Sequence, residues 1–431
     1  MNDGRARKQQ YLMGESIQFI RSVPRWLFVR NLSGRWPSAA TGALSCIRRV
    51  ETPPPRLPTQ EWVRIRPYMS GICGSDLSAI ACKGSPYFSP FVSTPFVLGH
   101  ELVGEIVETG NETPKAWQVG RRVVIEPALG CEVRGLRPPC RSCAAGEYAN
   151  CENITKGSIP AGFQTGYCAG TGGGWSTATV VAHPSQLQAV PDVVSDEEAA
   201  LAEPFACSLH AALKIPREKG KTILVIGSGT IGLLLIHGYR RAGGQGRVLV
   251  VARFAHQAEM ARMLGADECV NLRPPREFYQ WVLERGGGAG EGAGIYQPEL
   301  GKPVVLGGVD CVVDCVGNSQ TIDDAVRLAR PGGLVLLVGM PGIPRNVDWT
   351  AIWYKQLRVQ GTYAYGWETA PDGRRVKTIQ LGLEYMAGNP GALAPLVSGR
   401  FSLEEYRAAI QHAFRTDLPG NFKTMFVLPR T

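Results

Sequence analysis

The sequence predicts an α/β protein of two domains, a β-rich part followed by a doubly wound parallel sheet. Before about residue 190, short segments of alternating apolar and polar residues are separated by Gly, Asn and Pro, as half-buried strands are. After about residue 220, continuous apolar runs alternate with helical segments, which is typical of parallel strands covered by helices. A chain of 431 residues, 44% of them hydrophobic, is long enough for both domains.

The β-rich part is predicted to contain strands at residues 62–66, 99–108 and 121–125. Three consecutive prolines, residues 53–55, mark an irregular entry into the first of them. Residues 1–45 show little periodicity, so no element and no function is assigned there. A helix capped by Ser195 or Asp196 indicates a domain junction.

In the second part, strands are predicted at residues 223–229, 247–253, 309–315 and 334–340. Helices are predicted between them, at residues 229–243, 256–266 and 319–328. The glycine-rich segment 285–294 is predicted to be a mobile surface loop without an assigned function.

Charge and cysteine content restrict the class of protein. The formal net charge is +9, but the basic residues are spread along the chain, so we expect neither a nucleic-acid nor a membrane partner. The chain shows no signal peptide and no window of about 20 apolar residues, which indicates a soluble, cytoplasmic protein. In a reducing compartment, the twelve cysteines are expected to be metal ligands or buried thiols rather than disulfides.

A glycine motif predicts a dinucleotide site at the start of the second domain. The motif follows an apolar strand and opens a helix, and it consists of Gly227, Ser228, Gly229, Thr230, Ile231 and Gly232. Such glycines permit a tight turn, close approach of a pyrophosphate and close packing of the helix. The N-terminus of the helix would add N–H donors and a positive dipole for the phosphates.

The last residues of the next predicted strand bear on the choice of cofactor. NAD sites place an acid there, about 20 residues after the glycines, to hold the ribose hydroxyls. This sequence has Ala252 at that position and Arg253 beside it, with His256 and Gln257 nearby. Because an arginine can pair with a 2′-phosphate, NADP(H) is favoured over NAD(H). An arginine on a solvated turn is the alternative, and it would leave the choice open.

Four cysteines within one loop predict a structural zinc site. Cys140, Cys143 and Cys151 form a compact group, and Cys131 precedes them across a longer spacer. Four thiolates suit tetrahedral zinc, whereas the alternative is a set of buried thiols.

A second set of candidate ligands is scattered along the chain. Cys73 and His100, with a carboxylate from Glu101 or Glu203, would give a catalytic zinc three ligands and leave one position open. Taken singly, these residues would more often be core or surface residues. Their order and the motifs around them make the case.

From residue 62 to the C-terminus the chain resembles the zinc-containing medium-chain dehydrogenases, especially the sorbitol, threonine and glucose dehydrogenase branch. The segments that carry the resemblance are GICGSD, GHE, the four-cysteine loop, AEP, GSGTIG and LGAD. The resemblance implies a GroES-like β-rich catalytic domain at residues 1–205, with a zinc lobe at about 131–151, completed by 364–431. A Rossmann cofactor domain would occupy residues 206–363. A dimer or tetramer is also implied.

The resemblance implies specific roles for the site residues. Cys73 and His100 would bind zinc, with Glu101 or Glu203 as the third ligand. Asp76 would accept a hydrogen bond from His100 and fix its tautomer, and Ser75 would carry the proton away from the alcohol. The long spacer after Cys131 and the extended N-terminal region depart from the family pattern.

The predicted reaction is therefore the interconversion of an alcohol and its carbonyl, with two zinc ions per chain and hydride transfer to or from the cofactor. A secondary alcohol, a polyol or a sugar-like molecule is the substrate class that the family suggests. Two alternatives share the fold: a zinc-independent enone or quinone reductase, and a cofactor-binding protein without turnover. The pocket residues are open, and the candidates, which could equally be core, are Tyr87, Phe88, Phe96, Trp175 and Trp367.

Overall fold

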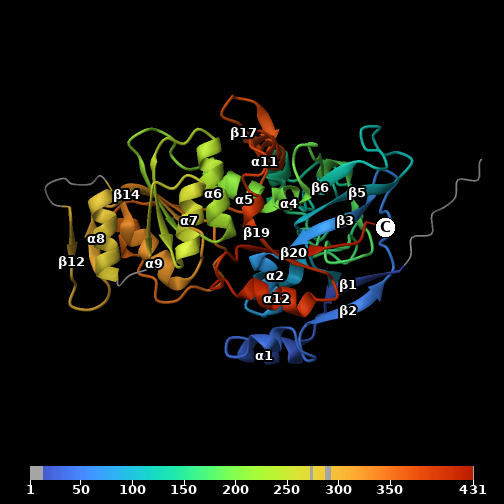
Figure 1. Ribbon diagram of the computed structural model, residues 1–431, viewed down its shortest axis with the longest axis horizontal. Coiled ribbons are helices and arrows are strands. Elements are labelled where there is room, and N and C mark those ends of the chain that lie inside the picture. Colours follow the sequence, from blue (N-terminus) through green and yellow to red (C-terminus); the bar gives the residue numbers. More distant parts are fainter. Residues whose placement is uncertain (1–12, 272–274, 287–292, 431) are drawn as a thin grey trace, which may run out of the picture. The chain divides into compact units, whose positions relative to one another are not determined.

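The structure, a computed structural model, describes residues 13–271, 275–286 and 293–430 (Figure 1). The chain divides into two compact units. The first comprises the chain up to Asp192 with Gly399–Phe414 and the C-terminal stretch from Thr424. The second comprises Val193–Ser398 and Arg415–Lys423. Among the described residues, no helix is both long and apolar enough to cross a membrane.

The division differs from the predicted boundaries at residues 205 and 363, because the second unit begins earlier and keeps the chain as far as Ser398. The reason is a packed layer of three helices, α5 (Ala202–Ala212), α6 (Thr230–Arg241) and α11 (Thr378–Ala387). Phe205 of α5 packs against Gly238 of α6 and Gly382 of α11, where a Cβ atom would lie 3.3 and 3.4 Å from its ring. The segment around α11 therefore belongs to the second unit.

A seven-stranded sheet is the frame of the first unit. Its order is β19–β20–β3–β5–β6–β8, with β7 also paired to β3. The strand expected at residues 62–66 is confirmed and runs on to Gly71, and the other two expected strands are present with shorter N-terminal ends. The elements are β3 (Val63–Gly71), α2 (Gly74–Ile80), β5 (Leu102–Thr109), β6 (Arg122–Ile125), α3 (Arg141–Ala144), β7 (Val180–Ala182), β8 (Leu187–Ala189), β19 (Val397–Phe401), α12 (Tyr406–Phe414) and β20 (Lys423–Val427).

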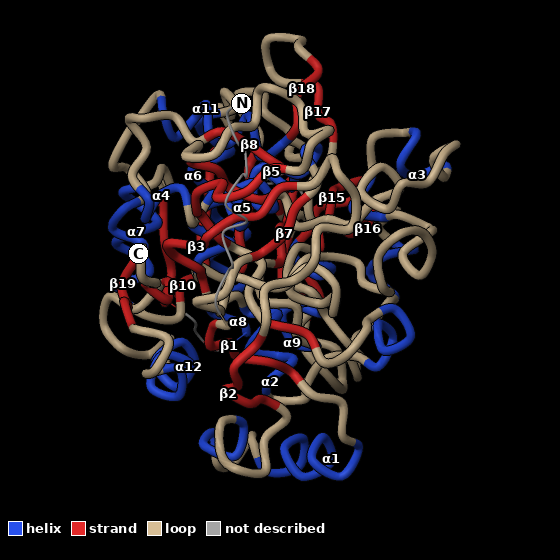
Figure 2. Tube along the Cα trace, turned by 90° about the vertical axis from the view of Figure 1, so that its right-hand side faces the viewer, coloured by secondary structure: helices blue, strands red, loops and turns tan. Residues whose placement is uncertain are grey.

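A smaller sheet, β2–β1–β4, occupies the N-terminal part of the chain, where the sequence predicts no element. Its strands β1 (Gly14–Phe19) and β2 (Ile47–Thr52) are antiparallel, and β4 (Phe96–Val97) pairs with β1. The connection from β1 to β2 contains helix α1 (Val23–Leu32) and a 3₁₀ turn (Pro37–Ala40). Figures 1 and 2 both show α1 at the lower end of the first unit, beyond α2 and β2.

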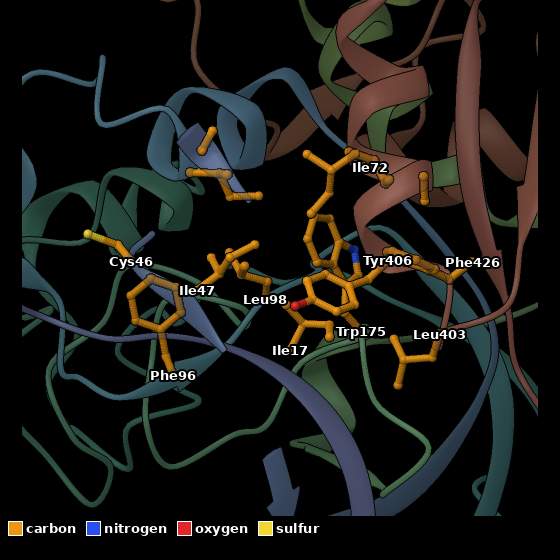
Figure 3. Close-up of a cluster of buried hydrophobic side chains, with 14 of the residues drawn as sticks. Ile17, Cys46, Ile47, Ile72, Phe96, Leu98, Trp175, Leu403, Tyr406 and Phe426 are labelled. Atoms are coloured by element: carbon orange, nitrogen blue, oxygen red, sulfur yellow. The ribbon is translucent and has the colours of Figure 1, made fainter. Parts of the chain in front are cut away.

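The two sheets of the first unit enclose an apolar core, part of which is drawn in Figure 3. Trp175 is fully buried there, its ring lying edge-on to Phe426, and its Nε1 donates to the Gly71 carbonyl at 3.0 Å. Phe96 is also buried and stacks on Phe19. Phe96 and Trp175 are therefore core residues, which is the alternative that the sequence left open for them.

A six-stranded parallel sheet forms the second unit, in the order β11–β10–β9–β14–β15–β16. The predicted alternation of strands and helices is confirmed, and α9 has the predicted bounds. The glycine-rich segment 285–294 lies largely outside the described residues. The elements are α4 (Asp196–Ala199), β9 (Thr222–Ile226), β10 (Arg247–Ala252), α7 (Ala255–Met263), β11 (Glu268–Asn271), α8 (Pro275–Arg285), β12 (Gly294–Tyr296), β13 (Val304–Leu306), β14 (Val309–Asp314), α9 (Ser319–Leu328), β15 (Ala329–Leu337), α10 (Thr350–Tyr354), β16 (Arg358–Gly361), β17 (Trp367–Thr369) and β18 (Arg375–Lys377).

Candidate functional site

Three candidate zinc ligands meet at one end of the β3–β5 pair. The strands are antiparallel, with Ser70 opposite Leu102, so the residues that follow β3 and those that precede β5 are neighbours. The donor atoms of Cys73, His100 and Glu101 all lie within 4.8 Å of one another. Sheet pairing therefore brings together residues that are far apart in sequence.

Backbone contacts fix this end of the sheet. The Gly71 N–H and the Ser70 hydroxyl both donate to the Glu101 carbonyl, at 2.8 and 3.0 Å. Gly99, which precedes the ligands, has a φ of +94°, and a Cβ atom there would lie 2.8 Å from the backbone nitrogen of Trp175. Only glycine fits this turn, so the glycine of the GHE segment sets the position of His100.

Helix α2 places Asp76 and Ser75 on two sides of the imidazole. One Asp76 oxygen, Oδ2, accepts from the Cys73 N–H at 3.0 Å, while Oδ1 lies 3.5 Å from His100 Nδ1. The Ser75 hydroxyl lies 3.4 Å from His100 Nε2. A proton on Nδ1, directed to Asp76, leaves a lone pair on Nε2, which is the tautomer that a metal needs.

The electrostatics of this group suit a cation. Asp76, His100 and Glu101 are all buried, and the facing atoms Asp76 Oδ1 and His100 Nδ1 have no hydrogen-bond partner among the described residues. Burial by itself lowers the pKa of His100, but the Asp76 carboxylate and Cys73 raise it well above 6.5. Because its surroundings stabilise positive charge, this set of sulfur, nitrogen and oxygen donors fits a divalent metal ion.

Glu203 belongs to the second unit. It lies in the first turn of α5, is buried, and accepts a contact from the Cys207 thiol at 3.5 Å. The group of three donor residues in the first unit does not include it.

The four lobe cysteines form the second candidate metal site. The sulfur atoms of Cys131, Cys140, Cys143 and Cys151 lie within 4.8 Å of one another, and the Cys131 and Cys151 sulfurs are 3.6 Å apart. The long spacer after Cys131 is taken up by a turn, so this cysteine reaches the other three.

Several N–H groups point at these sulfur atoms. The Cys131 N–H donates to Cys143 Sγ at 3.4 Å and the Cys140 N–H to Cys131 Sγ at 3.3 Å. Asn153 donates twice, from its backbone to Cys151 Sγ at 3.3 Å and from its side chain to Cys131 Sγ at 3.4 Å. Such donors stabilise thiolates, the form that binds zinc. Asn153 was not predicted, although it follows Cys151 by only two residues.

A buried cation also lies in this lobe and was not predicted from the sequence. This cation is Arg134, which lies between Cys131 and Cys140 in the sequence. Its side chain is fully buried. Its guanidinium donates to five backbone carbonyls, those of Leu129, Lys156, Ile159, Pro160 and Gly162. Nothing in the local sequence signals this role, because the accepting carbonyls depend on the path of the loop.

The predicted dinucleotide turn is built in the second unit as the motif requires. Gly227 follows β9 directly and has a φ of +99°. Beyond Gly229 there is open space where a Cβ would be, while a Cβ at Gly232 would lie 2.0 Å from the Gly227 carbonyl. The three glycines thus make the turn, leave room for a ligand and pack the helix. Within the same motif, Ser228 contacts Gln257 at 3.5 Å, Thr230 donates to the Phe422 carbonyl at 2.7 Å, and the Ile231 carbonyl accepts from Ser208.

Arg253 follows β10 directly and is exposed. Its guanidinium lies over the Phe254 ring, and within the described residues it forms no ion pair. The His256 ring stacks on the same Phe254 ring, with centroids 5.6 Å apart. The buried Nε2 atom of His256 has no hydrogen-bond partner within the described chain. The strand that precedes Arg253 ends in Ala252, so no carboxylate stands at the position that NAD sites use.

The remaining aromatic candidates for a substrate pocket are exposed. Tyr87 is 72% exposed, and Phe88 and Trp367 are each 43% exposed. Tyr87 and Phe88 lie edge to face beside each other in the first unit, and Trp367 lies in the second. All three remain candidates, in contrast to the two core residues.

The chain matches two family models and is similar to known dehydrogenases. Residues 59–192 match the alcohol dehydrogenase GroES-like domain, and residues 230–376 match the zinc-binding dehydrogenase family. Sorbitol dehydrogenase of Bacillus subtilis (strain 168) is 28% identical over 370 residues, which cover 85% of this chain and 90% of that protein. L-idonate 5-dehydrogenase of Vitis vinifera is 30% identical over 372 residues, covering 85% and 88%.

The fold is shared with solved structures as well. 2R,3R-butanediol dehydrogenase from Bacillus subtilis superposes with a TM-score of 0.69 at 22% identity, covering 96% of this chain and all of that one. This likeness supports the predicted fold class, which is confirmed. With its matched domains and curated relatives, the chain belongs to the zinc-dependent medium-chain alcohol dehydrogenases, oxidoreductases that interconvert an alcohol and its carbonyl with a nicotinamide cofactor.

Proposed function

We propose that this enzyme is an NADP(H)-preferring dehydrogenase of secondary alcohols, polyols or sugar-like alcohols. The observation that carries the proposal is the buried group of Cys73, His100 and Glu101, whose donor atoms lie within 4.8 Å of one another. The substrate class follows the relatives, which are named for sorbitol and L-idonate. A screen of such alcohols with NADP⁺, followed by absorbance of the reduced cofactor, tests it directly.

The chain's own residues have separate tasks in this reaction. Cys73 and His100 would hold a zinc ion, which would supply a Lewis acid for lowering the pKa of a substrate alcohol. Asp76 is a positioning residue, because it faces Nδ1 and not the substrate side of His100. The Ser75 hydroxyl, 3.4 Å from His100 Nε2, is placed to pass the alcohol proton toward solvent.

Glu101 and Glu203 are the two candidates for the third ligand. Glu101 is favoured, because its carboxylate lies with Cys73 and His100 in one compact group. Glu101→Gln should then lower zinc affinity by more than the roughly 10- to 100-fold that loss of an outer-shell partner typically costs, whereas Glu203→Gln, outside this group, should lower it by less. The reverse result would assign Glu203 as the ligand.

Two zinc ions per chain are proposed, one in each cluster. We expect metal analysis to find two zinc ions in the parent and one in each of Cys73→Ser and Cys131→Ser. Cys269→Ser, at a half-buried thiol outside both clusters, is the matched control and should keep both. A parent protein with a single zinc, lost in only one of the two variants, would remove the other site.

The preference for NADP(H) rests on Arg253 and His256. Within the described residues, the exposed Arg253 guanidinium forms no ion pair and the buried His256 Nε2 has no hydrogen-bond partner, so both can bind a 2′-phosphate. Arg253→Ala should weaken NADPH binding by about 10- to 100-fold and NADH binding little, since a charge-assisted pair contributes about 1.5–3 kcal/mol. Arg262→Ala, at an exposed arginine of α7, is the control. Equal affinities of the parent for NADPH and NADH would contradict the preference.

Assembly and location complete the proposal. A dimer or tetramer is expected, and light scattering on the purified enzyme measures it. None of the twelve cysteines, all of which lie among the described residues, forms a disulfide, which supports a reducing, cytoplasmic location.

A further inference from the structure

The connection between β1 and β2 carries an unusual concentration of exposed apolar side chains. Val23, Leu27, Phe28, Trp36 and Leu44 expose between 37% and 67% of their surface. We call these five residues, together with the arginines at positions 21, 30, 35 and 48, the N-terminal patch. Scattered exposed apolar residues are ordinary, whereas five within one short connection indicate a surface that contacts something apolar.

Helix α1 has an inner face that is anchored to the first unit. Val29 is fully buried in the core cluster. The Arg30 guanidinium and the Ser33 hydroxyl donate to the carbonyls of Cys82 and Ala81, at 3.0 and 3.1 Å, just beyond α2. The helix is therefore held in place on one side without help from its outer residues.

The outer face of α1 is apolar as well. Val23 and Leu27 are one helical turn apart, so they share a face, and both are exposed, with Phe28 beside them. Arg25 donates to the Ala43 and Ser45 carbonyls, which brings the loop that holds Leu44 next to the helix. The described residues leave this second apolar face uncovered, although a helix that is apolar on both sides is normally buried.

The charge of the connection is entirely positive. Between Glu15 and Glu51 the chain carries six arginines and no lysine, aspartate or glutamate. Arg49 is paired with Glu15. The four arginines of the patch are exposed, and the described residues supply no acidic partner for them. They are Arg21, Arg30, Arg35 and Arg48.

We propose that the N-terminal patch binds the enzyme peripherally to a bilayer that contains anionic phospholipid. Exposed aliphatic and aromatic side chains concentrated in one connection, together with exposed arginines and no acids, match a segment that lies in the interface of an anionic membrane. Trp36 suits the headgroup level, and the guanidinium of Arg35 lies over its ring at 5.6 Å from the centroid.

A second copy of the chain fits this surface less well. A symmetric dimer would bring the same patch of each subunit together, and so would oppose two sets of unpaired arginines. A nucleic acid would satisfy the arginines, but it offers no apolar surface to Val23 and Leu27. The even spread of basic residues along the sequence predicts no membrane partner, and the proposal departs from that expectation because the segment between Glu15 and Glu51 carries arginines and no acidic residue.

The test is sedimentation of the full-length enzyme with lipid vesicles. One set contains phosphatidylcholine alone, and the other contains equal parts of phosphatidylcholine and phosphatidylglycerol. We expect binding to the anionic set at low salt, and weaker binding at high salt. Leu27→Ser with Phe28→Ser, and separately Arg21→Gln with Arg35→Gln, should each weaken the binding by about tenfold or more.

A matched control tests whether changing exposed apolar and basic residues elsewhere on the enzyme also weakens vesicle binding. Leu300→Ser with Arg262→Gln changes an apolar and a basic side chain that are exposed in the second unit, and it should bind as the parent does. The unfolding temperatures of all variants show whether each has folded. The proposal is overturned if the parent does not prefer anionic vesicles, or if folded patch variants bind as the parent does. A patch variant that lowers the mass of a lipid-free oligomer would also overturn it, in favour of a second copy of the chain.

Discussion

At the scale of single residues, Arg134 shows how the long loop segments of the four-cysteine lobe are held together. Its guanidinium donates to carbonyls from two separate parts of the loop, at 3.0 Å to Leu129 and 2.8 Å to Lys156 among others. Arg134→Met would leave these buried carbonyls without donors, so we expect the free energy of unfolding to fall by about 3 kcal/mol or more. Urea unfolding measures the change. Lys156→Met removes an exposed cation of the same lobe and should cost little; similar losses in both variants would contradict the role of Arg134.

His237 provides a pH test at the same scale. Burial, together with Arg241, lowers the pKa of this histidine from 6.5 to about 4 in the folded protein. The unfolded chain takes up the proton already near pH 6.5, so between these two values it binds more protons than the folded state. The free energy of unfolding is therefore undiminished by His237 above pH 6.5, and it decreases as the pH drops toward 4.

The expected loss reaches up to about 3 kcal/mol across that window. His237→Leu keeps an apolar contact with Phe205 and should remove this part of the pH dependence. Urea unfolding of both proteins at several pH values between 4 and 7 measures the difference. Parallel pH profiles would show that another group is responsible.

Residue identity was predictable where chemistry dictates the residue type. The four lobe cysteines and the group of Cys73, His100 and Glu101 were singled out, and the structure brings each set together. Which aromatic side chains could face a substrate was not predictable. Trp175 and Phe96 are buried in the fold and Tyr87 is exposed, and no sequence pattern distinguishes these positions. Burial of a single aromatic residue depends on contacts from distant parts of the chain.

At the scale of elements, the turn before β5 decides whether the metal ligands meet. Gly99→Ala would force a Cβ to within 2.8 Å of the Trp175 backbone, at a φ of +94°. Gly120 has a similar φ of +89° but no atom within 4 Å of such a Cβ, which makes Gly120→Ala the matched control. We expect a loss of about 1 kcal/mol for the control and a clearly larger one for Gly99→Ala, with loss of zinc from the Cys73 cluster. Urea unfolding and metal analysis measure both, and equal effects would contradict the argument.

The elements that were predicted best have strong local signals. Helix α9 was placed correctly, and Asn318 caps it by accepting from Gln320 and Thr321. Helix α1 was missed because its sequence, VPRWLFVRNL, is apolar on both faces and shows no 3.6-residue stripe. Periodicity detects a helix with one buried side and does not detect one whose outer side is also apolar.

At the scale of the whole molecule, the two units carry different ligand sites. Both cysteine-containing clusters lie in the first unit and the glycine turn lies in the second. A metal chelator should therefore lower the unfolding temperature of the first unit, and NADPH should stabilise the second by about 2.7 kcal/mol at a hundredfold excess over its Kd. Scanning calorimetry with each ligand measures this. A single transition that responds in the same way to both would show that the units unfold together.

The order of the two domains was predictable, but their boundaries were not. Apolar runs identify parallel strands, and the glycine motif identifies the first of them. The membership of α11 depends on small residues such as Gly382 that admit the Phe205 ring, and single-sequence patterns do not reveal such helix contacts.

The connection between β1 and β2, which contains α1, begins and ends at neighbouring residues, because Phe19 and Ile47 are direct partners in the β1–β2 ladder. The strand pairing from Gly14 and Thr52 onward is thus independent of how long the intervening segment is. The entropy of closing such a loop grows only slowly with length. Evolution could therefore lengthen, shorten or exchange this segment without altering the register of the sheet, and a protein engineer could graft a foreign peptide at the same place.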